Sequence, residues 1–405
     1  MDQAPVQRTE AFRNTIPLVP WAVLWLLAPV AALDLIFADV LTRNWGHVLG
    51  RDFSNLWTAG RLVLEGNSSC VFDLGCFRIK QFDSLGLLAN QNYSYPPHAL
   101  FLAVPFAIPS YPVALALWTI AGILFLTWSS RSFLPKGFPP LLVAFTTAGW
   151  LNIWNGHYGF FLAGLWLLCF RFIKTRPRMA GVMAGLLTFK PHLGVMIAAT
   201  VAQRRKALLA ALITTALAFA VSAAVFGLGT WLSFFEQTTG AQAHILARMT
   251  PQVYFRMMPS PYVAFGRGIP GIAAQVAFVG CTLWLLWRRG KMDAFSAATA
   301  TFLIVPYSFN YDMTVVCLGV AILLYQHWNR LLRYERIALV IAFLSPQLTF
   351  FLPPLVPLSL LAALSIQLKL PPVGPRLGLG FAEWRDNKNE KASVVKGEIE
   401  SLQVA

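Results

Sequence analysis

Long apolar stretches separated by short polar breaks constrain the fold of this chain more than any other feature. Of its 405 residues, 57% are hydrophobic and only 12% are charged, whereas a soluble domain carries about 25% charged residues. Stretches of this kind are typical of helices that cross a membrane. The sequence therefore predicts an all-α polytopic integral membrane protein.

We predict ten spans and one pair of shorter pieces. The first span follows Arg8 and Arg13, but it is too long for a signal peptide and lacks a convincing cleavage site, so we interpret it as an uncleaved anchor. The ten spans are Leu18–Leu41, Tyr111–Thr127, Leu141–Ile153, Phe160–Ile173, Ala207–Phe226, Ile269–Trp287, Ala294–Val305, Met313–Tyr325, Ile337–Phe351 and Leu355–Leu368. The two pieces Ala180–Phe189 and Leu193–Ala202 are too short to cross alone.

Basic residues in the short breaks predict the orientation. The breaks hold Arg131 and Lys136; Arg171, Lys174, Arg176 and Arg178; Arg204, Arg205 and Lys206; Arg288, Arg289 and Lys291; and Arg330, Arg333 and Arg336. Short basic loops remain in the cytoplasm. We therefore attribute the net charge of +15 to topology and expect no nucleic-acid partner.

This orientation divides the chain. We predict a cytoplasmic N-terminus over residues 1–17, a membrane domain over 18–368 and a mobile cytoplasmic tail over 369–405. The opposite, outer side then holds two large loops, residues 42–97 and 227–268.

The first outer loop contains Asp52 at the start of a predicted amphipathic helix on the membrane surface. The apolar face of this helix is formed by Phe53, Leu56, Trp57, Gly60 and Leu64, and Gly66 ends the helix. Asp52 is suited to cap this helix. It is equally suited to act as a general base at the membrane surface, and the residues alone leave both roles open.

Lys190 lies between the two short pieces, and Pro191 breaks the helix there. Because basic breaks flank the pair on both sides, we expect it to enter from the cytoplasm and return, like a re-entrant helix pair. A lysine at such depth is costly unless it is paired. It could snorkel to the outer interface, but we favour a phosphate site formed with His192.

Other polar residues gather on the same side. Tyr95 and His98 flank two prolines beside a short apolar segment, Ala99–Ile108, and a broken segment of this kind indicates a neighbouring cavity. His157 could be a ligand or an ordinary turn residue, and Asp312 could be a site residue or a helix cap.

Three further residues complete the predicted outer side. Arg256 could hold a lipid phosphate or be a solvated charge. Cys70 and Cys76 share the first outer loop, where a disulfide is possible but their spacing does not decide it.

Metal-binding patterns are missing from the sequence. The six histidines are scattered, and neither an acidic doublet of the Asp-x-Asp type nor a phosphate-binding glycine-rich loop with Lys-Ser/Thr occurs. We therefore predict no metal and no cofactor.

A series of short motifs, in order along the chain, resembles glycosyltransferase family 87, which includes polyprenol-phosphate-mannose-dependent mannosyltransferases. The motifs are Arg51-Asp52-Phe53, Tyr95-Pro96-Pro97, Asn155-Gly156-His157, Phe189-Lys190-Pro191-His192 and Tyr311-Asp312. His157 and His192 depart from the family pattern, in which a glutamine is common at both positions.

The resemblance implies a GT-C-like fold with about ten to twelve transmembrane helices and surface helices in the first outer loop. By this resemblance Asp52 matches the family's catalytic acid, and Lys190 and His192 stabilise the charge of the donor phosphate. We also predict Arg256 near the donor phosphate, and Arg51, Tyr95, His98, His157 and Asp312 at the acceptor or pocket.

The implied activity is an inverting, metal-independent transfer of a sugar, a mannose-like hexose or a pentose, from a polyprenyl-phosphate donor to a cell-envelope glycolipid or glycan. It would occur at the outer face of the cytoplasmic membrane, with the bilayer and these substrates as partners and no obligate protein partner. The alternative is a transporter or flippase for a lipid-linked glycan. That alternative predicts related halves and ionisable residues near the midplane, and the sequence shows no repeat.

Overall fold

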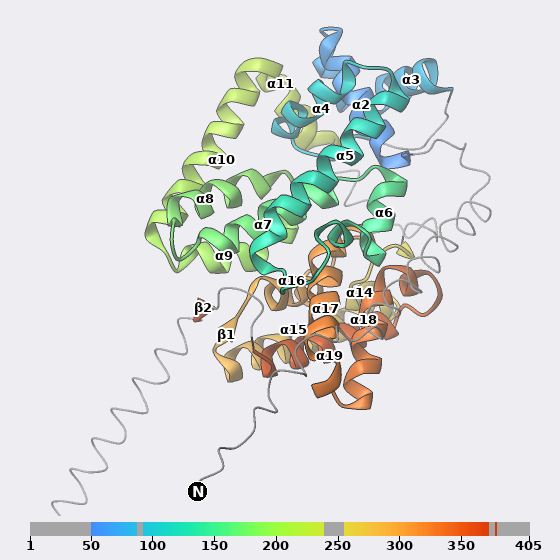
Figure 1. The fold of residues 1–405 in the computed structure, drawn as a ribbon. Coiled ribbons are helices and arrows are strands. Elements are labelled where there is room, and N and C mark those ends of the chain that lie inside the picture. Colours follow the sequence, from blue (N-terminus) through green and yellow to red (C-terminus); the bar gives the residue numbers. More distant parts are fainter. Residues whose placement is uncertain (1–49, 87–91, 239–254, 372–376, 379–405) are drawn as a thin grey trace, which may run out of the picture.

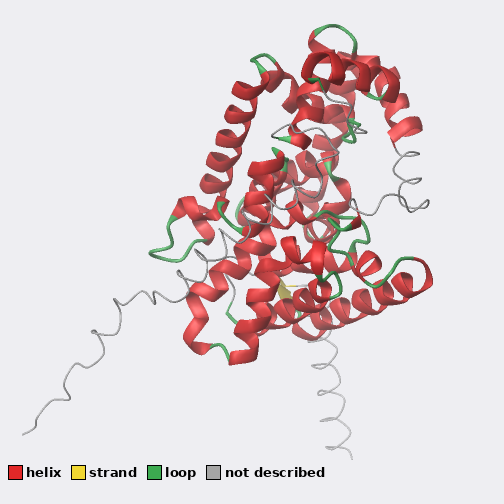
Figure 2. Cartoon of the chain, turned by 90° about the vertical axis from the view of Figure 1, so that its right-hand side faces the viewer, coloured by secondary structure: helices red, strands yellow, loops and turns green. Residues whose placement is uncertain are grey.

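The computed structural model describes residues 50–86, 92–238, 255–371 and 377–378 (Figure 1). The predicted first span, Asp34 within it and most of the tail lie outside these residues. Nearly all of the described chain is helical (Figure 2). The described strands are β1 (Lys291–Met292) and β2 (Leu377–Gly378), which pair antiparallel.

The helices follow the predicted apolar stretches closely. They are α2 (Arg51–Leu64), α3 (Leu74–Leu85), α4 (Leu100–Ala107), α5 (Tyr111–Ser130), α6 (Thr147–Asn155), α7 (Gly159–Phe172), α8 (Pro177–Leu186), α9 (Val195–Ala202), α10 (Arg205–Phe226), α11 (Leu228–Ser233), α14 (Pro261–Ala264), α15 (Gly268–Arg289), α16 (Ala294–Ile304), α17 (Thr314–His327), α18 (Arg333–Phe351) and α19 (Leu355–Lys369).

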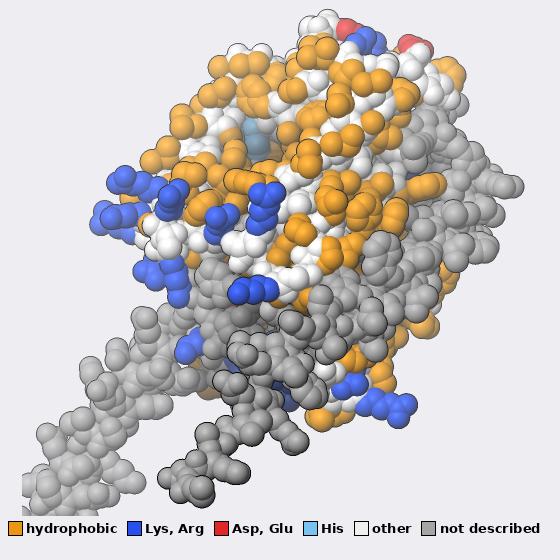
Figure 3. All heavy atoms as spheres, in the orientation of Figure 1, with side chains coloured by type: hydrophobic (Ala, Val, Ile, Leu, Met, Phe, Trp, Pro, Cys, Tyr) orange, Lys and Arg blue, Asp and Glu red, His pale blue; other side chains and the backbone are white. Residues whose placement is uncertain are grey.

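The structure confirms an all-α membrane fold. Three helical segments within the described ranges are long and apolar enough to cross a membrane alone: α5 with its following turn, α10 and α15. The outward face of α10 is apolar, with Leu212 and Ile213 each 58% exposed. Apolar side chains cover much of the visible surface in Figure 3, as expected for a surface in contact with lipid.

The predicted span Leu141–Ile153 is wrong as one continuous helix. Residues Pro140–Ala144 form a 3₁₀ turn, and α6 begins only at Thr147. Thr146 caps α6, since its Oγ1 accepts a hydrogen bond from the Gly149 N–H at 3.2 Å. Two prolines before the segment and a capping threonine inside it therefore outweigh its continuous apolar character.

The helix predicted after Asp52 is present as α2, and its apolar face is buried except at Leu64, which is 45% exposed. A Cβ on Gly60 would lie 2.9 Å from the backbone oxygen of Ala103 in α4. Trp57 also donates from Nε1 to the backbone oxygen of Pro109 at 3.1 Å. Close packing on α4 thus fixes α2, and with it the position of Asp52.

The short pieces around Lys190 form the expected helix pair. α8 continues into a 3₁₀ turn, η6 (Leu187–Phe189), and a second turn, η7 (Pro191–Gly194), leads into α9. Lys190 occupies the break between the two turns. In the first outer loop, Cys70 and Cys76 form a disulfide with Cα atoms 5.4 Å apart.

Candidate functional site

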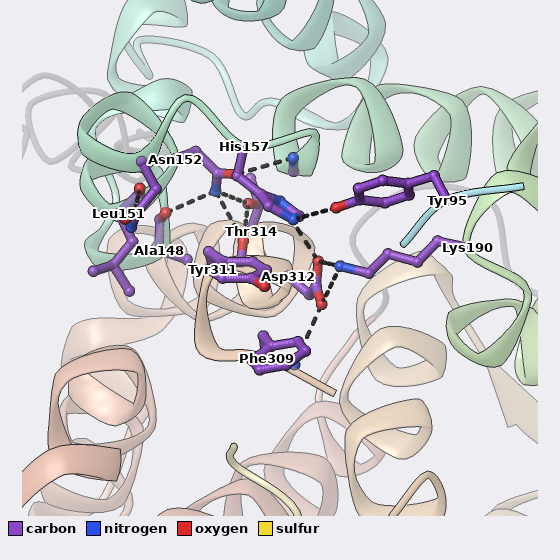
Figure 4. Close-up of polar contacts among 12 residues, drawn as sticks. Tyr95, Ala148, Leu151, Asn152, His157, Lys190, Phe309, Tyr311, Asp312 and Thr314 are labelled. Atoms are coloured by element: carbon purple, nitrogen blue, oxygen red, sulfur yellow. Dashed lines mark hydrogen bonds and ion pairs between the residues drawn. The ribbon is translucent and has the colours of Figure 1, made fainter. Parts of the chain in front are cut away.

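An ion pair between Lys190 and Asp312 lies at the centre of the candidate site (Figure 4). The Lys190 Nζ donates to both carboxylate oxygens of Asp312, at 2.6 and 2.7 Å. The side chain of Lys190 is 6% exposed and that of Asp312 is fully buried. The pair joins the break between α8 and α9 to η9 (Asn310–Met313), the turn before α17.

Burial and attraction act in opposite directions on this pair. Burial disfavours both charged forms, so it lowers the pKa of Lys190 and raises the pKa of Asp312, whereas each partner's charge opposes that shift in the other. The Lys190 ammonium also lies 5.0 Å from the ring centre of Tyr311. The sequence predicted a deep lysine that serves as a cation for a phosphate, and the structure gives this lysine a buried counter-ion.

Tyr95 and His157 extend the cluster on one side. The Tyr95 hydroxyl lies 2.7 Å from His157 Nε2, and His157 Nδ1 lies 3.9 Å from Asp312 Oδ1. Burial, followed by the charges of Lys190 and Arg51, lowers the pKa of His157 well below its usual range. A neutral imidazole that accepts from the tyrosine keeps its single N–H on Nδ1, toward the carboxylate.

Asn152 fixes this corner of the site. Its Nδ2 donates to the backbone oxygens of Ala148 and Tyr311, both at 2.8 Å, and its Oδ1 accepts from the Gly159 N–H at 2.9 Å. The side chain thereby ties α6, the start of α7 and η9 together. Sequence reasoning missed this residue, although an asparagine inside the apolar α6 was the available signal.

Asp52 is not the N-cap of α2. Gly50 occupies that position with a φ of 77°, and Asp52 is the second helical residue. The Gly50 N–H donates to the Trp154 backbone oxygen at 3.0 Å, and the Tyr111 hydroxyl donates to the Gly50 oxygen at 2.8 Å. These bonds hold the start of the helix without using the aspartate, so the simple capping role is wrong.

The Asp52 carboxylate belongs to the same cluster of charges. Arg51 Nε lies 3.3 Å from Asp52 Oδ1, and the Asp52 side chain is 17% exposed. Burial, then the carboxylates of Asp312 and Asp52, raise the pKa of Tyr95 well above its usual range. The site thus contains one partly exposed carboxylate and one fully buried carboxylate.

Asp312 is not an N-cap either, since it is the third residue of η9. Its Oδ2 accepts from the Phe309 N–H at 3.3 Å. The side chain therefore stabilises its own turn while it binds Lys190.

The two other predicted histidines, His98 and His192, are neutral groups. His98 stacks on Trp231 with ring centres 5.8 Å apart, and burial lowers its pKa to about 4. The ring of His192 lies 5.3 Å from that of Tyr307. Burial, followed by the charge of Lys190, lowers the pKa of His192 to about 3. Neither histidine supplies a positive charge at neutral pH.

Arg256 lies at the edge of the site with an exposed side chain. The next residue, Met257, accepts from Arg51 Nη2 through its sulfur at 3.7 Å. The loop of Arg256 therefore contacts the site through its neighbour.

A mainly apolar pocket adjoins the ion pair. Lys190 and Asp312 contribute to its wall, together with apolar residues of α7, α16 and α17 that include Trp166, Phe302 and Val315. Within residues 50–86, 92–238 and 255–371, no three His, Cys, Asp or Glu side chains come together as metal ligands would.

Comparison with known proteins gives one match. The model of glycosyltransferase family 87 matches residues 93–307, slightly more than half of the 405-residue chain. The matched segment includes Tyr95, His157 and Lys190, whereas Asp52 and Asp312 lie outside it. No curated protein and no solved structure matches.

Proposed function

Because the chain belongs to glycosyltransferase family 87, we propose that it transfers a sugar from a polyprenyl-phosphate donor to a hydroxyl group of a cell-envelope glycolipid or glycan. Family membership makes it a membrane glycosyltransferase. The donor, a hexose of the mannose type or a pentose, and the class of acceptor are the proposal.

The arrangement of the two carboxylates supports this reaction best. Asp312 is fully buried and bound to Lys190, whereas Asp52 is 17% exposed at the start of α2. A general base must reach the proton that it removes. Asp52 satisfies that requirement, and Asp312 is better suited to hold Lys190 in position.

The proposed step is a single displacement. The Asp52 carboxylate takes the proton of the acceptor hydroxyl while the hydroxyl oxygen attacks the anomeric carbon of the sugar. The bond from that carbon to the phosphate oxygen breaks, and its electron pair leaves with polyprenyl phosphate. Attack from the face opposite the leaving group inverts the anomeric configuration.

Charge builds up on the departing phosphate, and Lys190 is the cation proposed to stabilise it. An ammonium group has three N–H donors. Two of them are directed at Asp312, so a third can bind a phosphate oxygen without separating the pair. His192, which is neutral because burial lowers its pKa to about 3, contributes a hydrogen bond rather than a charge.

The proposed orientation follows the basic breaks. Both termini lie in the cytoplasm of a multi-pass inner-membrane protein, and Asp52, Lys190 and Asp312 face the exterior or periplasm. Donor and acceptor are then both lipid-linked or wall-linked molecules of that outer face. No metal and no cofactor takes part in the proposed step.

A transfer assay tests the proposal. The purified chain in vesicles is given radiolabelled polyprenyl-phosphate mannose and a glycolipid extract of bacterial membranes, with and without EDTA. We expect a labelled glycolipid, with inverted anomeric configuration by NMR and an unchanged rate in EDTA. Movement of the labelled donor across the vesicle membrane without a new glycoside would contradict the proposal and support a flippase.

A further inference from the structure

Seven basic side chains form a patch, here called the basic patch, at the turns between α7 and α8 and between α9 and α10. They are Arg171, Lys174, Arg176, Arg178, Arg204, Arg205 and Lys206. All except Arg171 are exposed. No acidic residue occurs between residues 171 and 206. Figure 3 shows Lys and Arg side chains gathered over α8 to α10, whereas Asp and Glu are visible only at the top of that face.

The two turns lie side by side because α8 and α10 pack very closely. Gly181 of α8 rests against the backbone of Ala207 in α10, and a Cβ on Gly181 would overlap the Ala207 carbonyl. One turn further along, a Cβ on Gly185 would lie 2.9 Å from the backbone oxygen of Ala211. Both helices therefore begin at the basic patch and run together away from it.

Five of these charges, Arg176, Arg178, Arg204, Arg205 and Lys206, lie at the N-terminal ends of α8 and α10, which are the less favourable ends for cations. Arg176 and Arg204 are the residues before the first turns of α8 and α10, and neither helix has a side-chain cap. A helix N-terminus carries partial positive charge, so it favours anions and disfavours cations. Repulsion between these cations, and between them and the helix ends, is relieved when an anion binds among them.

The surface above the patch indicates what kind of anion binds. The outward face of α10 continues from the patch as an exposed apolar strip that includes Leu209, 48% exposed, and Leu212 and Ile213, each 58% exposed. A ligand that contacts both the basic patch and this apolar strip has acyl chains that lie along α10 and a negatively charged headgroup at the first turn of that helix. We propose that the basic patch binds the headgroups of anionic phospholipids in the adjoining leaflet.

Native mass spectrometry of the full chain tests this proposal. The protein is released from nanodiscs that contain equal amounts of phosphatidylglycerol and phosphatidylcholine, and the retained lipids are counted. We expect several-fold more phosphatidylglycerol than phosphatidylcholine on the unmodified chain. The variant Arg204→Gln/Arg205→Gln/Lys206→Gln should lose most of that preference.

A matched control removes the same number of charges elsewhere. The variant Arg330→Gln/Arg333→Gln/Arg336→Gln alters a turn that also holds Glu335, whose Oε1 binds Lys369 at 2.9 Å. This variant should keep the preference for phosphatidylglycerol. An equal loss in both variants, or no loss in the first, would overturn the proposal.

Two measurements do not depend on how the variants fold. Raising the salt concentration from about 0.05 to 0.5 M should weaken the preference of the unmodified chain, because added ions screen exposed charges. A salt-independent preference would count against headgroup binding. Inorganic phosphate at millimolar concentration should leave the preference unchanged. If it instead displaced the lipid completely, the ligand would be a free phosphate and the lipid assignment would be wrong.

Discussion

Both carboxylate oxygens of Asp312 bind the ammonium of Lys190, at 2.6 and 2.7 Å, although the two residues are 122 positions apart in the chain. Neither side chain has appreciable contact with solvent. The pair is therefore a fixed link between the helix pair α8–α9 and the turn before α17. It also means that most of the charge of Lys190 is already balanced within the protein.

Removing one partner of this pair should destabilise the protein strongly. Lys190→Met leaves the Asp312 carboxylate buried without its counter-ion, and such a loss costs about 3–5 kcal/mol. The double variant Lys190→Met/Asp312→Asn removes both charges and should recover much of the loss. Thermal unfolding in detergent micelles measures both effects. Equal stability of the single and double variants would show that the two charges are not coupled.

Asp52→Asn should abolish most of the transfer activity while the protein still folds and binds donor. The asparagine has nearly the same size but cannot take up the proton of the sugar-accepting hydroxyl. Loss of a general base lowers turnover about a hundredfold or more. The control is Asp73→Asn, because Asp73 caps α3 by accepting from the Cys76 N–H at 2.8 Å, a role that asparagine can keep. Near-normal turnover in Asp52→Asn would remove Asp52 from the catalytic role.

Tyr95→Phe should be more damaging than Tyr93→Phe. The first variant removes the hydroxyl that lies 2.7 Å from His157 Nε2 and leaves a buried nitrogen unpaired, which costs about 1–3 kcal/mol. The second removes only a long contact of 3.4 Å between the hydroxyls of Tyr93 and Tyr158. Thermal unfolding of the two variants gives the comparison. The reverse order of stability would mean that His157 does not depend on Tyr95.

Gly60→Leu should displace α2 and lower both stability and activity. The added side chain meets the backbone of Ala103 in α4, and overpacking of this kind typically costs about 1–3 kcal/mol. Gly280→Leu is the matched control, since Gly280 also lies inside a helix, α15, but has open space at its Cβ position. We expect little change in that variant. If both variants unfolded at the same temperature, the contact between α2 and α4 would not be what fixes Asp52.

Apolar length and helix breakers predicted most of the helices, because a membrane imposes the same requirement on every span. α10 and α15 match the predicted ranges within two residues at each end. The break in the span Leu141–Ile153 was missed because apolar content was given more weight than Thr146, a good capping residue. The capping side chain of Thr146 therefore marks where α6 begins.

The candidate site was predicted as a set of residues rather than as a set of contacts. Tyr95, His157, Lys190 and Asp312 were each identified from their turns, and the structure brings them together. Their pairing could not be predicted, because nothing near Lys190 in the sequence indicates that a residue 122 positions later balances its charge. Asn152 was overlooked for the same reason, since its partners Tyr311, Thr314 and Gly159 lie in η9, α17 and α7.

The separation of Lys190 and Asp312 has a consequence for biosynthesis. Lys190 is translated 122 residues before its partner, an interval of roughly 6 to 24 s at about 5–20 residues per second. Throughout that interval the lysine lacks the Asp312 carboxylate that both holds it and balances its charge. Final assembly of the site is accordingly a late event in the synthesis of the chain.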